Sequence, residues 1–329
     1  VLFRSWLGIL KFGIDSNKVR TALDSLEPKH EGYQFLKQAL RNYIFQNDKL
    51  FWDSISFTNV LDTPALKNKL KQRFIETGYY NDTLKINDSL KLAKAIKKFQ
   101  ATFNLETDGK LGKYTKQALG LDKEKTIRQI EMALERWRWE PAKYPKQYTI
   151  VNIPSAMMYV WEWDKKHKID TLVLKSRVVV GKPENQTPTL KSKINYMMIY
   201  PYWNVPISIA TKEILPAVQR DTSYIRKKNF EVLGAGDKVL DYTKIPWRRY
   251  TKDYLPVRFR QRIGEENSLG VVKFNFNNPF GVYLHDTNSK RYFKTSSRAQ
   301  SHGCIRLENF IDFADFLIRD DSVHYNHDS

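Results

Sequence analysis

The chain has 329 residues, 41% of them hydrophobic and 13% aromatic, which predicts a folded protein of more than one domain and argues against intrinsic disorder. A formal net charge of +19 favours polyanionic partners such as nucleic acid, anionic lipid or a carboxylate-bearing cell wall. The single cysteine excludes an internal disulfide and any multi-cysteine metal site.

Two partner classes find no support in the sequence motifs. There is no RNP, zinc-finger or helix-turn-helix signature, so nucleic acid is not expected as a partner. No apolar run reaches the roughly 18 residues that a membrane span needs. The chain starts without Met, which leaves open a signal peptide or a membrane anchor upstream of Val1.

The N-terminal part of the chain predicts helices. Residues 1–83 form a helical scaffold region, in which VRTALDSL and YQFLKQALRNYI carry apolar residues three and four positions apart. Pro64 suits the first turn of a further helix. Residues 122–146 add a helical stretch, IRQIEMALERWRW, which ends before Pro141 and acts as scaffold or linker.

Between these stretches, residues 84–121 predict a small three-helix module. Ser89 is a candidate N-cap for a helix whose apolar positions face one core. Asp108-Gly109 predicts a turn, and the segment from Tyr114 to Leu119 predicts a short second helix. The module has few aromatic residues for sugar stacking, so it is also interpreted as a helical spacer that does not bind glycan.

From Gln147 the pattern changes to strands, with β-branched and aromatic segments such as TLVLKSRVVVGK divided by Pro, Gly, Asn and Asp. We predict a mostly β domain over residues 147–320. A long, less strand-like insertion over about 207–266 is a candidate lid. The segment LENFIDFADFLI predicts a helix that packs on the sheet. Residues 321–329 predict a frayed tail, whose two histidines lack a third metal ligand.

The lone cysteine, Cys304, lies in the stretch SHGCIRLEN near the end of this β domain. A cysteine nucleophile needs a base for its proton, a group that orients the base, and donors for the oxyanion. His285, which ends the apolar strand Gly-Val-Tyr-Leu, is the candidate base. Asp286 can orient its ring through the side chain or the backbone carbonyl. Arg306 adds positive charge that favours a thiolate and an anionic substrate.

Other interpretations of this cysteine have less support in the sequence. A lone cysteine is more often a small buried hydrophobe than a nucleophile, but the strand-borne histidine upstream favours catalysis. Papain-like enzymes place the cysteine before the histidine, and caspases carry a Gln-Ala-Cys motif that is absent here. Sortases place their arginine on a separate strand, whereas Arg306 stands two residues after Cys304.

The motif resembles the signature of the YkuD-type L,D-transpeptidase catalytic domain: a histidine (His285), fifteen residues, then Ser301-His302-Gly303-Cys304. Arg306 is similar to the larger, YcbB-type branch of that family. ERWRWEP, VNIPSAMMYVWE, the long block from RVVVGK to YWNVP, EILP and HDTNSKRYF resemble YcbB-type blocks in the expected order. AIKKFQATFNLETDGKLGKYTKQALG resembles a peptidoglycan-binding module.

The resemblance implies a reaction. Cys304 attacks the carbonyl of the third residue of a tetrapeptide stem, usually diaminopimelate, and releases the terminal D-Ala. The side-chain amine of a second stem then takes the acyl group, which gives a 3→3 cross-link. His285 matches the family's base, and the backbone carbonyl of Asp286 matches the group that orients it, so that the Asp286 side chain is dispensable.

The resemblance also implies roles for the residues around the nucleophile. Tyr283 is similar in position to an oxyanion-side tyrosine and acts there with the Gly303 and Cys304 amides. His302 and Arg306 shape the pocket and hold substrate carboxylates. Ser301 is interpreted as a hydrogen-bonding turn residue with a part in the site. Trp203 was interpreted as a buried aromatic rather than as part of a substrate channel.

Together these features predict a multidomain α+β protein: a helical N-terminal scaffold with a three-helix module, then a mostly β YkuD-type catalytic domain with a lid insertion. The expected partners are peptidoglycan stem peptides, glycan and carbapenem-type inhibitors, in the periplasm or cell envelope. No cofactor and no metal are expected. Three alternatives stay open: an L,D-carboxypeptidase, a transpeptidase that anchors lipoproteins, and a non-catalytic wall-binding protein.

Overall fold

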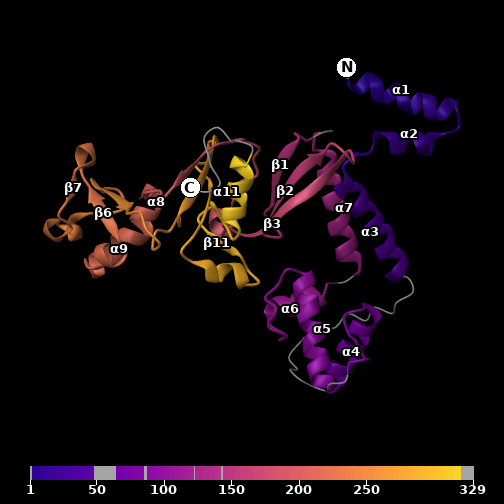
Figure 1. The fold of residues 1–329 in the computed structure, drawn as a ribbon, viewed down its shortest axis with the longest axis horizontal. Helices are drawn as coiled ribbons and strands as arrows, with labels where there is room; N and C mark the ends of the chain where they lie inside the picture. Colours follow the sequence, from indigo (N-terminus) through magenta and orange to yellow (C-terminus); the bar gives the residue numbers. More distant parts are fainter. Residues whose placement is uncertain (1, 48–63, 85–86, 122, 142–143, 320–329) are drawn as a thin grey trace. The chain divides into compact units, whose positions relative to one another are not determined.

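A computed structural model describes residues 2–47, 64–84, 87–121, 123–141 and 144–319 (Figure 1). The chain divides into two compact units, one of residues 1–148 with 162–171 and the other of residues 149–161 with 172–329. The predicted tail over residues 321–329 lies outside the described residues. In the described part of the chain, no helix combines the length and the apolar composition needed to span a membrane.

The first unit contains the predicted helical scaffold. Its helices outside the module are α1 (Leu2–Asp15), α2 (Val19–Leu26), α3 (Glu31–Asn47) and α7 (Lys123–Arg138). Helices α3 and α7 pack together: the Trp137 ring fills the space where a side chain at Gly32 would lie, and Arg138 Nη2 donates to Tyr33 Oη at 3.3 Å. Tyr33 is 1% exposed, so it anchors this helix pair.

The remaining helices of this unit are α4 (Pro64–Glu76), α5 (Asp88–Thr102) and α6 (Lys113–Leu119). The predicted start at Pro64 is confirmed. The three helices share one apolar core, made of Leu70, Phe74, Tyr80, Ala95, Ile96, Phe99 and Leu119. The Nε2 amide group of the buried Gln100 donates to Asp108 Oδ1 and Thr115 Oγ1 and so holds the turn between α5 and α6.

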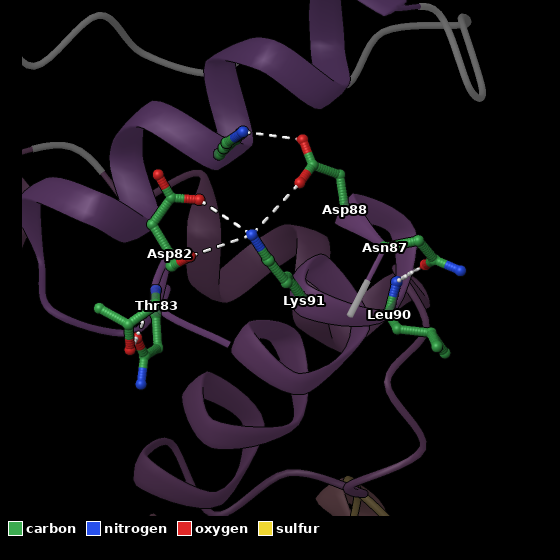
Figure 2. Close-up of polar contacts among 8 residues, drawn as sticks. Asp82, Thr83, Asn87, Asp88, Leu90 and Lys91 are labelled. Carbon is green, nitrogen blue, oxygen red and sulfur yellow. Dashed lines mark hydrogen bonds and ion pairs between the residues drawn. The ribbon is translucent and has the colours of Figure 1, made fainter. Parts of the chain in front are cut away.

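The entry into α5 corrects one prediction (Figure 2). Asn87, not Ser89, is the N-cap: its side chain accepts from the Leu90 amide at 2.9 Å. Lys91 then pairs with Asp82 at 3.1 Å and with Asp88 at 3.7 Å, as Figure 2 shows. These pairs connect the segment after α4 to α5, although exposed ion pairs of this kind contribute only about 0–1 kcal/mol.

The second unit is built on a sheet of eight strands, in the order β1-β2-β3-β12-β10-β9-β4, with β11 paired to β3. The strands are β1 (Gln147–Asn152), β2 (Met157–Asp164), β3 (Ile169–Gly181), β4 (Ile194–Ile199), β9 (Val272–Phe276), β10 (Leu284–His285), β11 (Ala299–Ser301) and β12 (Ile305–Leu307). The predicted C-terminal helix is α11 (Phe310–Ile318), which places Phe313, 0% exposed, in the core of this sheet.

The insertion has a sheet of its own, in the order β5-β8-β6-β7. Its elements are β5 (Trp203–Asn204), α8 (Ile207–Ile209), a π-helical turn (Ala210–Ile214), α9 (Leu215–Arg220), α10 (Tyr224–Lys227), β6 (Phe230–Leu233), β7 (Val239–Leu240) and β8 (Arg258–Gln261). A separate apolar core that includes Trp247 and Phe259 holds them together. The segment over about 207–266 is less strand-like than the rest of the domain, as expected, and its strands β6, β7 and β8 are only two to four residues long.

Short 3-10 turns complete the chain, at Pro183–Asn185, Ala235–Asp237, Tyr242–Lys244, Trp247–Arg249 and Lys290–Lys294. The predicted fold class, a helical N-terminal region followed by a mostly β domain, is confirmed. The exact domain limits stay predictions.

Candidate active site

Three neighbouring strands, β9, β10 and β12, carry core residues and candidate site residues at alternate positions. Strand β10 pairs in parallel with β12 and antiparallel with β9. Leu284 lies opposite Ile305 on one side and Phe274 on the other, and all three are buried in the core. The next row is His285 with Arg306 and Lys273. Because successive side chains point to opposite faces of a sheet, this second row lies on the face away from the core.

Cys304 and Tyr283 each stand one residue before these strands. Two-residue periodicity therefore puts Cys304 on the same face as Arg306, and Tyr283 on the same face as His285. The Ile305 amide donates to the Tyr283 carbonyl at 3.0 Å, which holds the two segments in register. The Tyr283 ring stands edge-on to the His285 ring at 5.5 Å between centroids, and the Tyr283 side chain acts to lower the pKa of the Cys304 thiol.

His285 is 4% exposed, and its ring is oriented by the backbone. Its Nδ1 hydrogen-bonds to the carbonyl oxygen of Asp286. A carbonyl only accepts, so Nδ1 carries the proton and Nε2 of the neutral ring is the basic nitrogen. Burial lowers the pKa of His285 to about 3, and the charge of Arg306 acts in the same direction, while the carbonyls of Asp286 and Leu269 oppose it. The imidazole is therefore neutral at physiological pH.

The carboxylate of Asp286 points away from this ring. It accepts from the Val271 amide at 3.0 Å and pairs with Lys290. Gly270, at φ +62°, leaves the space that this carboxylate fills. Of the two ways in which the sequence allowed Asp286 to orient the base, the structure contains the backbone carbonyl, while the side chain fastens the loop that precedes β9.

The turn that carries the thiol is held by two hydroxyl groups. Ser301 Oγ donates to the Cys304 carbonyl at 2.6 Å and accepts from the Gly303 amide at 3.1 Å. Thr187 Oγ1 accepts from the Gly181 amide and donates to the Gly303 carbonyl, both at 2.9 Å. Gly303 has φ +118°, a conformation that a side chain disfavours. The Gly303 amide, expected as an oxyanion donor, is thus engaged by Ser301 here. Thr187 was missed by the sequence analysis, because no motif distinguishes it from other threonines.

Two residues link this site to the insertion and its flank. His302 Nε2 lies 2.5 Å from Glu213 Oε1, in the π-helical turn. It was expected to hold a substrate carboxylate, and in this structure it contacts a carboxylate of the chain itself. Trp203, at the start of β5, is half-buried, and its side chain acts against the rise in the pKa of Tyr283 that burial causes. The side chain that was interpreted only as a buried aromatic therefore also acts on the site, and Glu213 is a contact that the sequence did not indicate.

The thiol lies among groups with opposing effects on its ionisation. Burial raises the pKa of Cys304 above its ordinary value, while the hydrogen bonds of Tyr283 and the charges of Lys273 and Arg306 lower it. Burial likewise raises the pKa of Tyr283, so its hydroxyl stays protonated and available as a donor. Lys273 was missed by the sequence analysis, since only the pairing of β9 with β10 brings it next to His285.

The site thus contains a thiol, a neutral imidazole held by a carbonyl, a protonated phenol and two cations. These are the parts that a cysteine acyl-transfer enzyme requires. No cluster of three or more histidine, cysteine or acidic side chains suited to a metal ion occurs among the residues that the structure describes.

Comparison with known proteins agrees with this class. Residues 146–324 match the family described as "L,D-transpeptidase catalytic domain", and this match covers more than half of the chain. The chain belongs to this YkuD family. Residues 68–119 match a second family, described as "Putative peptidoglycan binding domain". That match begins before the predicted limit at residue 84 and includes most of α4.

One curated relative is similar over about half of the chain. It is a Haemophilus influenzae protein named "Putative L,D-transpeptidase", 34% identical over 171 residues. The similarity covers 52% of this chain but only 33% of the relative. The chain therefore matches about a third of the length of that protein.

Proposed function

We propose that the protein is a peptidoglycan L,D-transpeptidase of the YcbB-type branch, with Cys304 as its nucleophile and a place of action in the periplasm or cell envelope. The observation that carries this proposal is the carbonyl-oriented His285 on β10, which stands next to the Tyr283 ring and pairs with β12, the strand that Cys304 directly precedes. The family match supports the reaction class. Arg306 after the cysteine and an insertion with its own sheet support the branch.

In the first half-reaction, His285 Nε2 accepts the proton of the Cys304 thiol, and the sulfur attacks the carbonyl carbon of the third residue of a tetrapeptide stem. Tyr283 and the Cys304 amide donate to the oxyanion. The intermediate then loses the terminal D-Ala, whose amine leaves with the proton from His285. A thioester remains on Cys304. A neutral imidazole suits this cycle, because it can take up and return one proton.

In the second half-reaction, an amine of another stem attacks the thioester carbonyl. The new C–N bond forms, the C–S bond breaks, and the amine proton passes through His285 to the sulfur. The product is a 3→3 cross-link. The module of α4, α5 and α6 binds peptidoglycan, as its match to a peptidoglycan-binding family supports.

Mass spectrometry of the intact protein tests the proposal. Incubation with a disaccharide-tetrapeptide is expected to add the acyl group to one site and to release D-Ala, and a carbapenem is expected to give one adduct. Both adducts are absent in Cys304→Ala. A wild-type protein that gives neither adduct contradicts the proposal. Product analysis then separates cross-linked dimer from tripeptide, the product of a carboxypeptidase.

A further inference from the structure

Strand β9 presents two polar side chains on the face that carries the candidate base, His285. Val272 and Phe274 are buried in the core, so Lys273 and Asn275 lie on the opposite face, the face of His285. Both side chains line a pocket of about 550 Å³, together with Tyr283 and the turn that joins β9 to β10. Lys273 lies opposite His285 in the pairing of β9 with β10, and Tyr283 stands edge-on to the His285 ring, so this pocket lies beside the candidate site.

Lys273 has no counter-charge in this pocket. Its Nζ lies 4.0 Å from the centroid of the Tyr283 ring, a cation–π contact. Among the described residues, no carboxylate lies within ion-pair distance of it. Burial lowers the pKa of Lys273, and the Cys304 thiolate opposes that effect. A half-buried ammonium that is paired only with a ring is a group to which an anion can bind.

Asn275 adds a second unused donor. Its Nδ2 is buried and has no hydrogen-bond partner among the described residues. The neighbouring Asn278 differs, because its Nδ2 donates to the carbonyls of Phe276 and Val282 at 3.0 and 2.8 Å. A buried donor left without a partner costs free energy, so an unpaired group of this kind calls for an explanation, such as a ligand or a water that it binds.

We propose that Lys273 and Asn275 form a carboxylate subsite that holds the acyl acceptor. The inference rests on the proposed function and specifies its second substrate as an amine that carries a carboxylate near the reacting nitrogen, as the free end of a diamino acid does. A bare ammonium would be repelled by Lys273, whereas an amino acid is held by its carboxylate. The same cation lowers the pKa of the bound amine, which must lose its proton before it attacks the thioester.

Alkylation of the thiol tests the subsite without any transpeptidase turnover. Iodoacetate and iodoacetamide both form a C–S bond to Cys304 and release iodide. Iodoacetate carries a carboxylate where iodoacetamide carries a neutral carboxamide. The chain has one cysteine, so the ratio of their rate constants reports this site alone, and the thiolate fraction cancels. Lys273→Gln is expected to lower the iodoacetate-to-iodoacetamide ratio about tenfold, and Asn275→Asp to lower it at least as much.

Lys175→Gln is the matched control, since Lys175 is also a strand-borne lysine over a tyrosine ring, at 5.8 Å from Tyr159, but lies outside the pocket. It is expected to leave the ratio unchanged. A Lys273→Gln protein with wild-type melting temperature and a wild-type ratio overturns the subsite.

The assignment to the acceptor is tested on the acylated enzyme, with glycine and glycinamide as competing amines. Lys273→Gln is expected to lower the preference for glycine about tenfold relative to wild type, a comparison in which the different basicities of the two amines cancel. A changed alkylation ratio with an unchanged glycine preference overturns the acceptor role. If wild-type protein forms no acyl-enzyme, the proposed function fails, while the alkylation ratio still decides whether the carboxylate site exists.

Discussion

The two faces of strands β9, β10 and β12 differ completely although they alternate residue by residue. One face carries Phe274, Leu284 and Ile305, which pack under α11. The other carries Lys273, His285 and Arg306. Packing of the core side chains fixes the three strands in place. The polar side chains on the other face are therefore also held in fixed positions. The comparison indicates that the candidate site needs no dedicated scaffold, because the same three strands that build the core position its side chains.

The largest effect on the acylation rate is expected from a substitution on the polar face, at His285. His285→Gln removes the base and is expected to slow acylation of Cys304 by the donor about 10²–10⁴-fold, with little change in the melting temperature. Asp286→Asn is the matched comparison. It keeps the backbone carbonyl that orients the ring and is expected to cost less than about tenfold. Rates come from the time course of the adduct by mass spectrometry. Equal losses in both variants would contradict the assignment of orientation to the backbone.

A substitution on the core side of the sheet is expected to affect stability instead of the acylation rate. Phe313→Ala removes a fully buried ring of α11 and is expected to lower the free energy of unfolding of its unit by about 3–5 kcal/mol. Denaturant unfolding followed by tryptophan fluorescence measures it. Acylation per folded molecule should remain near the wild-type rate. A large loss of that rate in protein that is still folded would show that the two faces are not separable.

A smaller change sharpens the role of one group on the polar face. Tyr283→Phe keeps the ring against His285 but removes the hydroxyl beside Cys304. If the hydroxyl donates to the oxyanion, the loss in acylation rate is about 10²–10³-fold. Alkylation by iodoacetamide, which forms no oxyanion, should change far less. Equal effects on both reactions would assign Tyr283 to the ionisation of the thiol instead.

The last prediction concerns pH. Burial raises the pKa of the thiol, so the thiolate is the minor form near neutrality, and its fraction rises about tenfold per pH unit below that pKa. The iodoacetamide rate should therefore climb steadily from pH 6 to pH 8. His285, with a pKa of about 3, stays neutral throughout and adds no inflection near pH 6.5. A plateau between pH 6 and pH 7 would instead indicate a preformed thiolate–imidazolium pair.

The sequence predicted the residues that lie within the motif or act locally, and it did not predict residues that are far from the motif in the sequence. His285 and Cys304 were found because a motif of fixed spacing carries them, and Pro64 because its effect is local. Ser89 was expected as the cap of α5 and Asn87 is the cap, because Ser and Asn both cap helices and the backbone decides which one does so. Lys273, Thr187 and Glu213 were missed because each meets the motif through long-range packing.

The sequence by itself therefore determined the order of helical and β regions, the identity of the candidate nucleophile and base, and the family resemblance, because periodicity and motif spacing are local properties of a chain. Only the tertiary structure decided which atoms meet the motif: the Asp286 carbonyl rather than its carboxylate at His285, Ser301 rather than an open site at the Gly303 amide, and a lysine beside the thiol. Those contacts follow from strand register and burial, which pair residues far apart in the chain and set the ionisation of the groups they enclose.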